Sequence, residues 1–82
     1  MKVIKVKYLS GNYLYDYAIS DEINWKKGDF CLVPTVIRDK LSFTVAEIIK
    51  EETIVPKMPL RFVERILPNF DPKLGLIKEH FT

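Results

Sequence analysis

The chain is poor in the residues from which metal sites and nucleophilic active sites are built. Its 82 residues include one histidine, His80, and one cysteine, Cys31. A zinc site needs three or four Cys, His or carboxylate ligands, and Cys/His catalysis needs the two side chains in contact. Cys31 lies inside the apolar run over residues 30–33, which is typical of a buried, inert thiol. We therefore expect no metal and no cofactor.

Glycine and long apolar stretches are also scarce. The three glycines, Gly11, Gly28 and Gly75, are isolated, so the sequence has no glycine-rich phosphate loop. No run approaches the roughly 20 apolar residues of a membrane helix, and the N-terminal residues do not form a signal-peptide pattern. A single cysteine cannot form an intramolecular disulfide. These features predict a cytoplasmic protein without a membrane partner.

Charge of either sign is limited as well. The 13 Lys and Arg residues exceed the 11 Asp and Glu residues by two, which gives a net charge of +2. Such a balance neither demands nor excludes a nucleic-acid partner. The carboxylates are scattered along the chain, and no pair has a spacing that identifies an acid/base site. We therefore expect a protein that is not an enzyme.

What the chain does have is apolar material, at 48% of its residues. That fraction is enough for one hydrophobic core, and 82 residues leave no room for a second. We expect one domain over residues 1–67, followed by a C-terminal tail over residues 68–82 that packs on it or extends from it. The chain should fold alone or as a small homo-oligomer.

Alternation of apolar and polar residues predicts five strands. They cover residues 3–9, 13–19, 30–34, 41–49 and 60–67. Gly28 suits a tight turn before the third strand, and Pro34 should end that strand or place it at an edge. The apolar phase slips at Ile48 and Ile49, which indicates a β-bulge or sharp bend. The fold class is mainly β, with a small five-stranded, strongly bent, barrel-like (SH3-like) sheet.

Two segments near the C-terminus are ambiguous. Residues 60–67 favour a strand with Leu60, Phe62 and Ile66 on one face, although Leu60, Val63 and Leu67 also suit a short helix. In the tail, Asp71 precedes Pro72 and could cap a short helix, which Gly75 would weaken. The tail is therefore expected to be irregular or helical.

Three segments follow one another as in a known family. The first carries Tyr15, Asp16 and Tyr17, the second runs from the turn at Gly28 to Pro34, and the third is the apolar run at residues 45–49. In order and spacing they resemble the N-terminal 3′-DNA-binding domain of primosomal protein N′, the replication-restart helicase. The resemblance covers roughly residues 3–67. It implies binding of single-stranded DNA 3′ ends.

The resemblance also implies site residues. The family's aromatic-Asp-Tyr motif falls on Tyr15, Asp16 and Tyr17, and its basic residue on the last strand falls on Arg61. An aromatic ring can stack on a terminal base, the Asp16 carboxylate can accept a hydrogen bond from a 3′-hydroxyl, and Arg61 can offset phosphate charge. The family's glycine after the Val-Pro strand is replaced by Thr35, and no helicase motor is present. The chain would thus be a stand-alone relative, as in a phage or mobile element.

Other interpretations of the same residues stay open. The tyrosines at positions 13, 15 and 17 share one strand face and could be a core ladder. Trp25, Lys40 and Lys57 are candidates for an interaction surface, since tryptophan is common at binding hot spots. The alternatives to DNA binding are a protein-interaction module and a structural subunit of a homo-oligomer.

Overall fold

The computed structural model describes residues 1–53, 57, 59–73 and 76–77, and these form a mainly β structure, as predicted. Its strands are β1 (Lys2–Tyr8), β2 (Leu14–Ile19), β3 (Phe30–Ile37), β4 (Lys40–Glu52), β5 (Arg65–Ile66), β6 (Phe70–Asp71) and β7 (Leu76–Ile77). The described residues contain no helix that could cross a membrane. Four residues of the predicted connection between the fourth and fifth strands, 54–56 and 58, lie outside the described residues.

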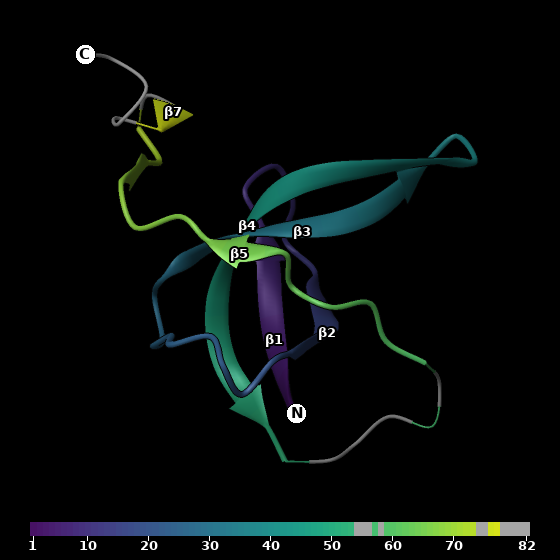
Figure 1. Cartoon of the computed structure of the whole chain (residues 1–82). Coiled ribbons are helices and arrows are strands. Elements are labelled where there is room, and N and C mark those ends of the chain that lie inside the picture. Colours follow the sequence, from purple (N-terminus) through teal and green to yellow (C-terminus); the bar gives the residue numbers. More distant parts are fainter. Residues whose placement is uncertain (54–56, 58, 74–75, 78–82) are drawn as a thin grey trace.

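Strands β1 to β5 form one bent antiparallel sheet in the order β2-β1-β4-β3-β5 (Figure 1). The long strand β4 bends so that one half pairs with β1 and the other half with β3. Opposite β1, the register of β4 skips Ile49, because Lys5 pairs with Lys50 and Val6 with Ile48. The predicted β-bulge is therefore confirmed, and it lets one strand serve two parts of the sheet.

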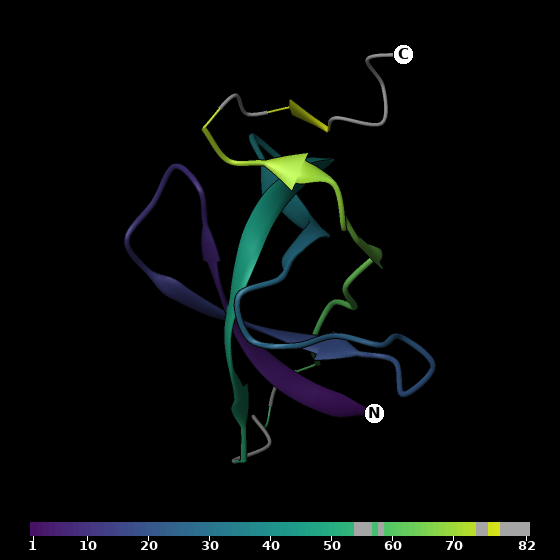
Figure 2. The ribbon, with the colours of Figure 1, turned by 90° about the vertical axis from the view of Figure 1, so that its left-hand side faces the viewer.

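The closing segment, residues 59–67, joins the two ends of the sheet into a barrel (Figure 2). The backbone N–H of Ala18 donates to Arg61 (2.9 Å), and the N–H of Val63 donates to the carbonyl of Ala18 (2.9 Å). Further along, the N–H of Glu64 donates to Leu32 on β3 (2.9 Å). The strand predicted over residues 60–67 is present in part, as the bridge between Phe62 and Ala18 and as β5.

The face that the closing segment buries differs from the predicted one. Val63 and Leu67 are buried, whereas Phe62, predicted to face inward, is 51% exposed. The segment changes partner from β2 to β3 between Val63 and Glu64, so a single period of two does not run through it. The buried residues Val63 and Leu67 are four positions apart, the spacing that also suits a helix, although the structure has no helix there.

The core lies inside the barrel and is built from every strand of the main sheet. Its fully buried side chains come from β1 to β4 and include Ile4, Ile19, Val33 and Ile48. Trp25 and Ile23 pack against this core from the loop between β2 and β3. Gly28 ends that loop with a φ of 95°, the left-handed conformation for which glycine was expected there.

The outer halves of β3 and β4 project from the barrel as a two-stranded arm, residues 34–43 (Figure 1). Of the two alternatives predicted for Pro34, the end of the strand is wrong, because β3 continues to Ile37, and the edge position is confirmed, because β3 pairs with β5 only at Cys31 and Leu32. The carbonyls of Leu32 and Pro34 bond to Glu64 N and Tyr17 Oη, so this side of β3 faces away from β4. The missing N–H of proline therefore falls on the side without a ladder, where it costs nothing.

The described part of the tail is not helical. Phe70 pairs with Ile77, and Asp71 pairs with Leu76, so that β6 and β7 form a small antiparallel sheet. The Asp71 carboxylate accepts a hydrogen bond from the N–H of Lys73 (2.9 Å), two residues on, and thus closes a turn instead of capping a helix. Residues 74–75 and 78–82 lie outside the described residues.

Candidate functional site

A pocket of about 200 Å³ opens where the closing segment separates from β2. We call it the fork pocket. It is lined by Tyr8, Tyr15, Asp16, Tyr17, Thr35, Pro59, Leu60 and Arg61. The structure therefore brings together all four residues that the sequence indicated, three from β2 and Arg61 from a segment more than 40 positions further along.

The pocket exists because one rung of the ladder between β2 and the closing segment is not formed. Ala18 directs both its N–H and its carbonyl to the closing segment, so these groups point away from β1. In a strand, the N–H and carbonyl groups of every second residue point to the same side. Those of Asp16 therefore point to the same side as those of Ala18. The next rung would join Asp16 to Pro59 and Arg61, and these described residues do not form it. The backbone of Asp16 therefore faces the pocket.

The carboxylate of Asp16 lies on the other face of β2. Its Oδ1 atom is 2.8 Å from Nζ of Lys5, the residue directly opposite on β1. This atom is buried and has no hydrogen-bond partner, so the contact is an ion pair without hydrogen-bond geometry. Lys5 also lies 3.9 Å from Oε2 of Glu52 on β4. The aspartate thus lines the pocket with its backbone while its charge is matched by Lys5.

Two tyrosine hydroxyls form the inner wall. The Tyr17 hydroxyl donates to the carbonyl of Pro34 (2.6 Å) and lies 2.6 Å from the Tyr8 hydroxyl. Because the proton of Tyr17 is used on Pro34, the Tyr8 hydroxyl must donate to Tyr17. Thr35 Oγ1 is 3.5 Å from the Tyr8 oxygen, at the limit of hydrogen bonding. With the proton of Tyr8 used on Tyr17, only the Thr35 hydroxyl can donate in this contact, and at that distance the bond is weak enough for the hydroxyl to turn to a ligand instead.

The phenol of Tyr17 carries no charge near neutral pH. Burial raises its pKa well above the ordinary value, the hydrogen bond with Tyr8 raises it further, and only the charge of Arg61 acts in the opposite direction. Arg61 lines the same pocket as the two tyrosines. The wall thus offers neutral oxygens beside one permanent positive charge.

Tyr15 forms the aromatic wall of the pocket. Its ring stacks on that of Tyr8, with centroids 4.3 Å apart and planes 13° from parallel. Tyr15 remains 39% exposed, in contrast to the buried Tyr17. The tyrosine ladder considered from the sequence is therefore divided, since Tyr17 is a core residue and Tyr15 retains a surface on which a ring could stack.

Arg61 has no acidic partner in the described part of the chain, where the ion pairs involve the N-terminus, Lys2 and Lys5. Asp16 is the one acidic residue among the eight that line the pocket, and its carboxylate is directed elsewhere. The pocket therefore has a positive potential and several hydrogen-bond donors. These are properties of a site for anionic oxygen atoms.

Three other residues proposed from the sequence lie outside the fork pocket. Trp25 borders a larger hollow of about 580 Å³, in which the charged groups already pair with one another, Lys2 with Glu51 and the N-terminus with Asp21. Its indole packs against the core, which holds the loop in place. Lys40 is exposed near the end of the arm, and Lys57 is exposed beside residues outside the description.

The sequence did not indicate four lining residues, Tyr8, Thr35, Pro59 and Leu60. Tyr8 could have been found, because it continues the inward phase of the first strand toward the tyrosines of the second. Thr35 replaces the family's glycine, which lines the pocket there, so the resemblance had indicated this position but no role for the threonine side chain.

No cluster of three or more His, Cys, Asp or Glu side chains that could hold a metal ion occurs in the described residues. In comparisons with known proteins, no family model, no curated protein and no solved structure matches the chain. The likeness to the 3′-DNA-binding domain thus stays a prediction from the motif, neither supported nor contradicted by these comparisons.

Proposed function

We propose that this chain is a non-enzymatic binding module that holds the 3′ end of single-stranded DNA in the fork pocket. One observation carries the proposal: Tyr15, Tyr17 and Arg61 share a pocket with the edge backbone of Asp16. The exposed ring of Tyr15 is suited to stacking on a terminal base, for about 1 to 3 kcal/mol. Arg61, which has no carboxylate within ion-pair distance among the described residues, is suited to a phosphate oxygen.

The size of the pocket favours an end over a continuous strand. Its volume of about 200 Å³ is below the roughly 300 to 1,000 Å³ of pockets that enclose a whole small molecule. A terminal sugar or phosphate would enter it, with the last base stacked at the rim. The polarity, 3′ and not 5′, comes from the resemblance alone.

The test is a fluorescence-anisotropy titration at low salt with a short oligonucleotide labelled at its 5′ end. We expect the linear strand to bind and an unlabelled circular strand of equal length to compete poorly, because a circle has no end. Tyr15→Ala should weaken binding about fivefold to a hundredfold, as loss of one stacking contact implies. Tyr13→Ala is the matched control, since Tyr13 belongs to the same tyrosine series but does not line the pocket.

Absence of binding at about 100 μM protein would refute the proposal, because even non-specific contacts with DNA are usually detectable there at low salt. Equal competition by the circular strand would show DNA binding without end recognition.

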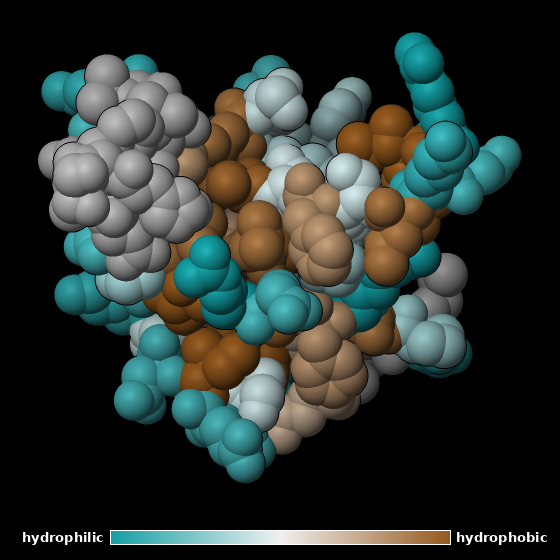
Figure 3. All heavy atoms as spheres, turned by 45° about the horizontal axis from the view of Figure 1, so that its top comes forward, coloured by the Kyte–Doolittle hydropathy of each residue, from teal (hydrophilic) through white to brown (hydrophobic). Residues whose placement is uncertain are grey.

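A second candidate function, protein–protein contact, is favoured by the outer face of the arm. Residues that pair directly between β3 and β4 share a face of the sheet, and on the outer face of the arm and of its base all of them are apolar. In the arm they are Pro34, Val36, Leu41 and Phe43, and at its base Leu32 and Val45. Leu41 is 65% exposed, and hydrophobic surface gathers toward the arm in Figure 3.

Sedimentation velocity across a range of concentrations tests this second candidate. If the arm mediates self-association, the sedimentation coefficient should rise with concentration, and Leu41→Lys should abolish the rise. A sedimentation coefficient that stays that of a monomer at all concentrations would show that the arm does not mediate self-association.

A further inference from the structure

We infer that the fork pocket selects a strand that ends in a 3′-phosphate over one that ends in a 3′-hydroxyl. This inference rests on the proposed function and specifies which terminal group the pocket takes. It departs from the role that the resemblance implies for Asp16, in which the carboxylate accepts a hydrogen bond from a free hydroxyl. The departure follows from where the structure places each polar group.

The first argument is the orientation of Asp16. A carboxylate that discriminated against phosphate would have to face the bound end, where the two negative charges would repel. Oδ1 of Asp16 is instead 2.8 Å from Lys5 Nζ, on the face of β2 opposite the tyrosines. Its charge is matched by that lysine, so the pocket contains no acid that would repel a phosphate.

The second argument is the set of groups that do face the pocket. Arg61 and Thr35 line it, and the backbone of Asp16 faces it at the unformed rung. Their donors are a guanidinium with a permanent charge, a hydroxyl and an N–H, and the carbonyl of Asp16 is an acceptor on the same side. A phosphate monoester is dianionic near neutral pH and has three terminal acceptor oxygens, which such a donor set can bind. A hydroxyl could use only a part of it.

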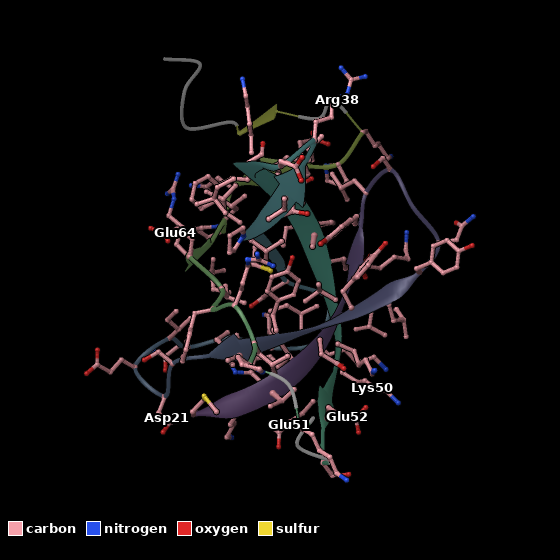
Figure 4. All side chains as sticks on the ribbon, turned by 90° about the vertical axis from the view of Figure 1, so that its right-hand side faces the viewer. Asp21, Arg38, Lys50, Glu51, Glu52 and Glu64 are labelled. Carbon is pink, nitrogen blue, oxygen red and sulfur yellow. The ribbon has the colours of Figure 1, made fainter. Side chains whose placement is uncertain are left out.

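The third argument is the distribution of charge around the pocket. The acidic residues Asp21, Glu51 and Glu52 lie at the end of the barrel opposite the arm, whereas the pocket is at the base of the arm beside Thr35 (Figure 4). Glu64, which follows Arg61 closely in sequence, points outward from the barrel (Figure 4). No acidic side chain of the described residues therefore forms an ion pair with the guanidinium that faces the ligand.

The experiment compares three forms of one oligonucleotide in competition against a labelled strand: 3′-hydroxyl, 3′-phosphate, and 3′-hydroxyl with a 5′-phosphate. We expect the 3′-phosphate form to bind about tenfold more tightly than the 3′-hydroxyl form, as one charge-assisted hydrogen bond gained implies. Arg61→Gln should remove this preference. Arg65→Gln is the matched control, because Arg65 is an exposed arginine of the same segment that does not line the pocket.

A further variant, Asp16→Asn, separates the two chemistries. Because the carboxylate faces away from the pocket, we expect this variant to keep the preference for the 3′-phosphate form. A rise of about tenfold or more in that preference would show that the carboxylate repels the phosphate, and would overturn the inference. Equal or tighter binding of the 3′-hydroxyl form by the unmodified protein would overturn it as well, while leaving the proposed function intact. A gain from the 5′-phosphate equal to that from the 3′-phosphate would refute selection of the 3′ end. Failure of all three forms to bind would remove the proposed function itself.

Discussion

Cys31 has an environment in the folded protein that differs strongly from water. It is fully buried among the core side chains of the barrel. Burial raises the pKa of its thiol to about 12, and the nearby charge of Asp29 contributes in the same direction. Because the thiolate is the reactive form, this thiol should be inert in the folded protein. Burial and the charge of Asp29 thus explain why the thiol should be inert, as the apolar run had predicted.

Thiol labelling tests this environment. With iodoacetamide at pH 8, native protein should be modified far more slowly than protein unfolded in guanidinium chloride, since only unfolding exposes Cys31 and restores an ordinary pKa. Mass spectrometry of the intact chain reports the modified fraction. Equal rates in the two conditions would mean that the core opens readily around β3.

The same pKa predicts how stability depends on pH. Between the ordinary pKa of 9.0 and the folded pKa of about 12, the thiol of Cys31 loses its proton in the unfolded chain but keeps it in the folded one. Its contribution to the free energy of unfolding is therefore complete below pH 9.0 and is lost as the pH rises toward about 12. Over that window the free energy of unfolding should fall by up to about 1.4 kcal/mol for each pH unit from this group. Cys31→Ala should remove this part of the decline. Urea unfolding at pH 7, 9 and 10.5 measures it, and parallel curves for the two proteins would contradict it.

At the scale of elements, the turn of the arm restricts which residue types suit its two central positions. Ile37 pairs with Lys40, so the turn has two residues, Arg38 and Asp39, with φ values of 52° and 63°. Two-residue hairpin turns of this type require a positive φ at both positions and prefer Asn-Gly. Arginine is poorly suited to this conformation, because its Cβ approaches the following carbonyl oxygen.

The double substitution Arg38→Asn and Asp39→Gly should therefore stabilise the protein. We expect a gain of about 1 kcal/mol and a rise in Tm of about 4 to 8 °C, as is usual for a domain of this length. Thermal unfolding followed by circular dichroism measures the change. A control at an exposed site outside the turn, Lys50→Gln, should leave Tm nearly unchanged. A lower Tm in the double variant would show that the arm uses the arginine itself.

At the scale of the whole molecule, stability depends on the closing segment. Val63 and Leu67 bury their side chains in the barrel, and the segment hydrogen-bonds to both β2 and β3. The tail contributes less, with a ring contact between Phe70 and Phe30 at 5.2 Å. The division into residues 1–67 and 68–82 remains a prediction from the sequence, and two truncations test it.

A chain that ends at Leu67 should unfold cooperatively, with a loss of roughly 1 to 2 kcal/mol from the missing contact of Phe70. A chain that ends before Pro59 should not unfold cooperatively, because the two sheet edges and the core beneath Val63 would be open to water. Urea titration monitored by the fluorescence of Trp25 distinguishes the two. Loss of cooperativity in the chain that ends at Leu67 would extend the domain into the tail.

The strands of the main sheet were predictable because their signal is local. Alternating side chains along β1 and β2, and the phase slip at Ile49, identify strands and a bulge without knowledge of their partners. The four candidate residues of the pocket were predicted from a motif, and the structure brings them together. The orientation of the Asp16 carboxylate also follows from alternation, although its pairing with Lys5 depends on the register of the hairpin.

The chain's sequence by itself determined a mainly β domain, its first hairpin and the segments that carry the pocket. Tertiary structure decided the rest, for reasons that are not local. Pro34 can lie inside β3 because its missing N–H falls on a side without a ladder, and the tail forms β6 and β7 where Asp71 closes a turn. The fork pocket exists because the closing segment leaves β2 after one rung. Only packing between distant segments fixes that point of separation.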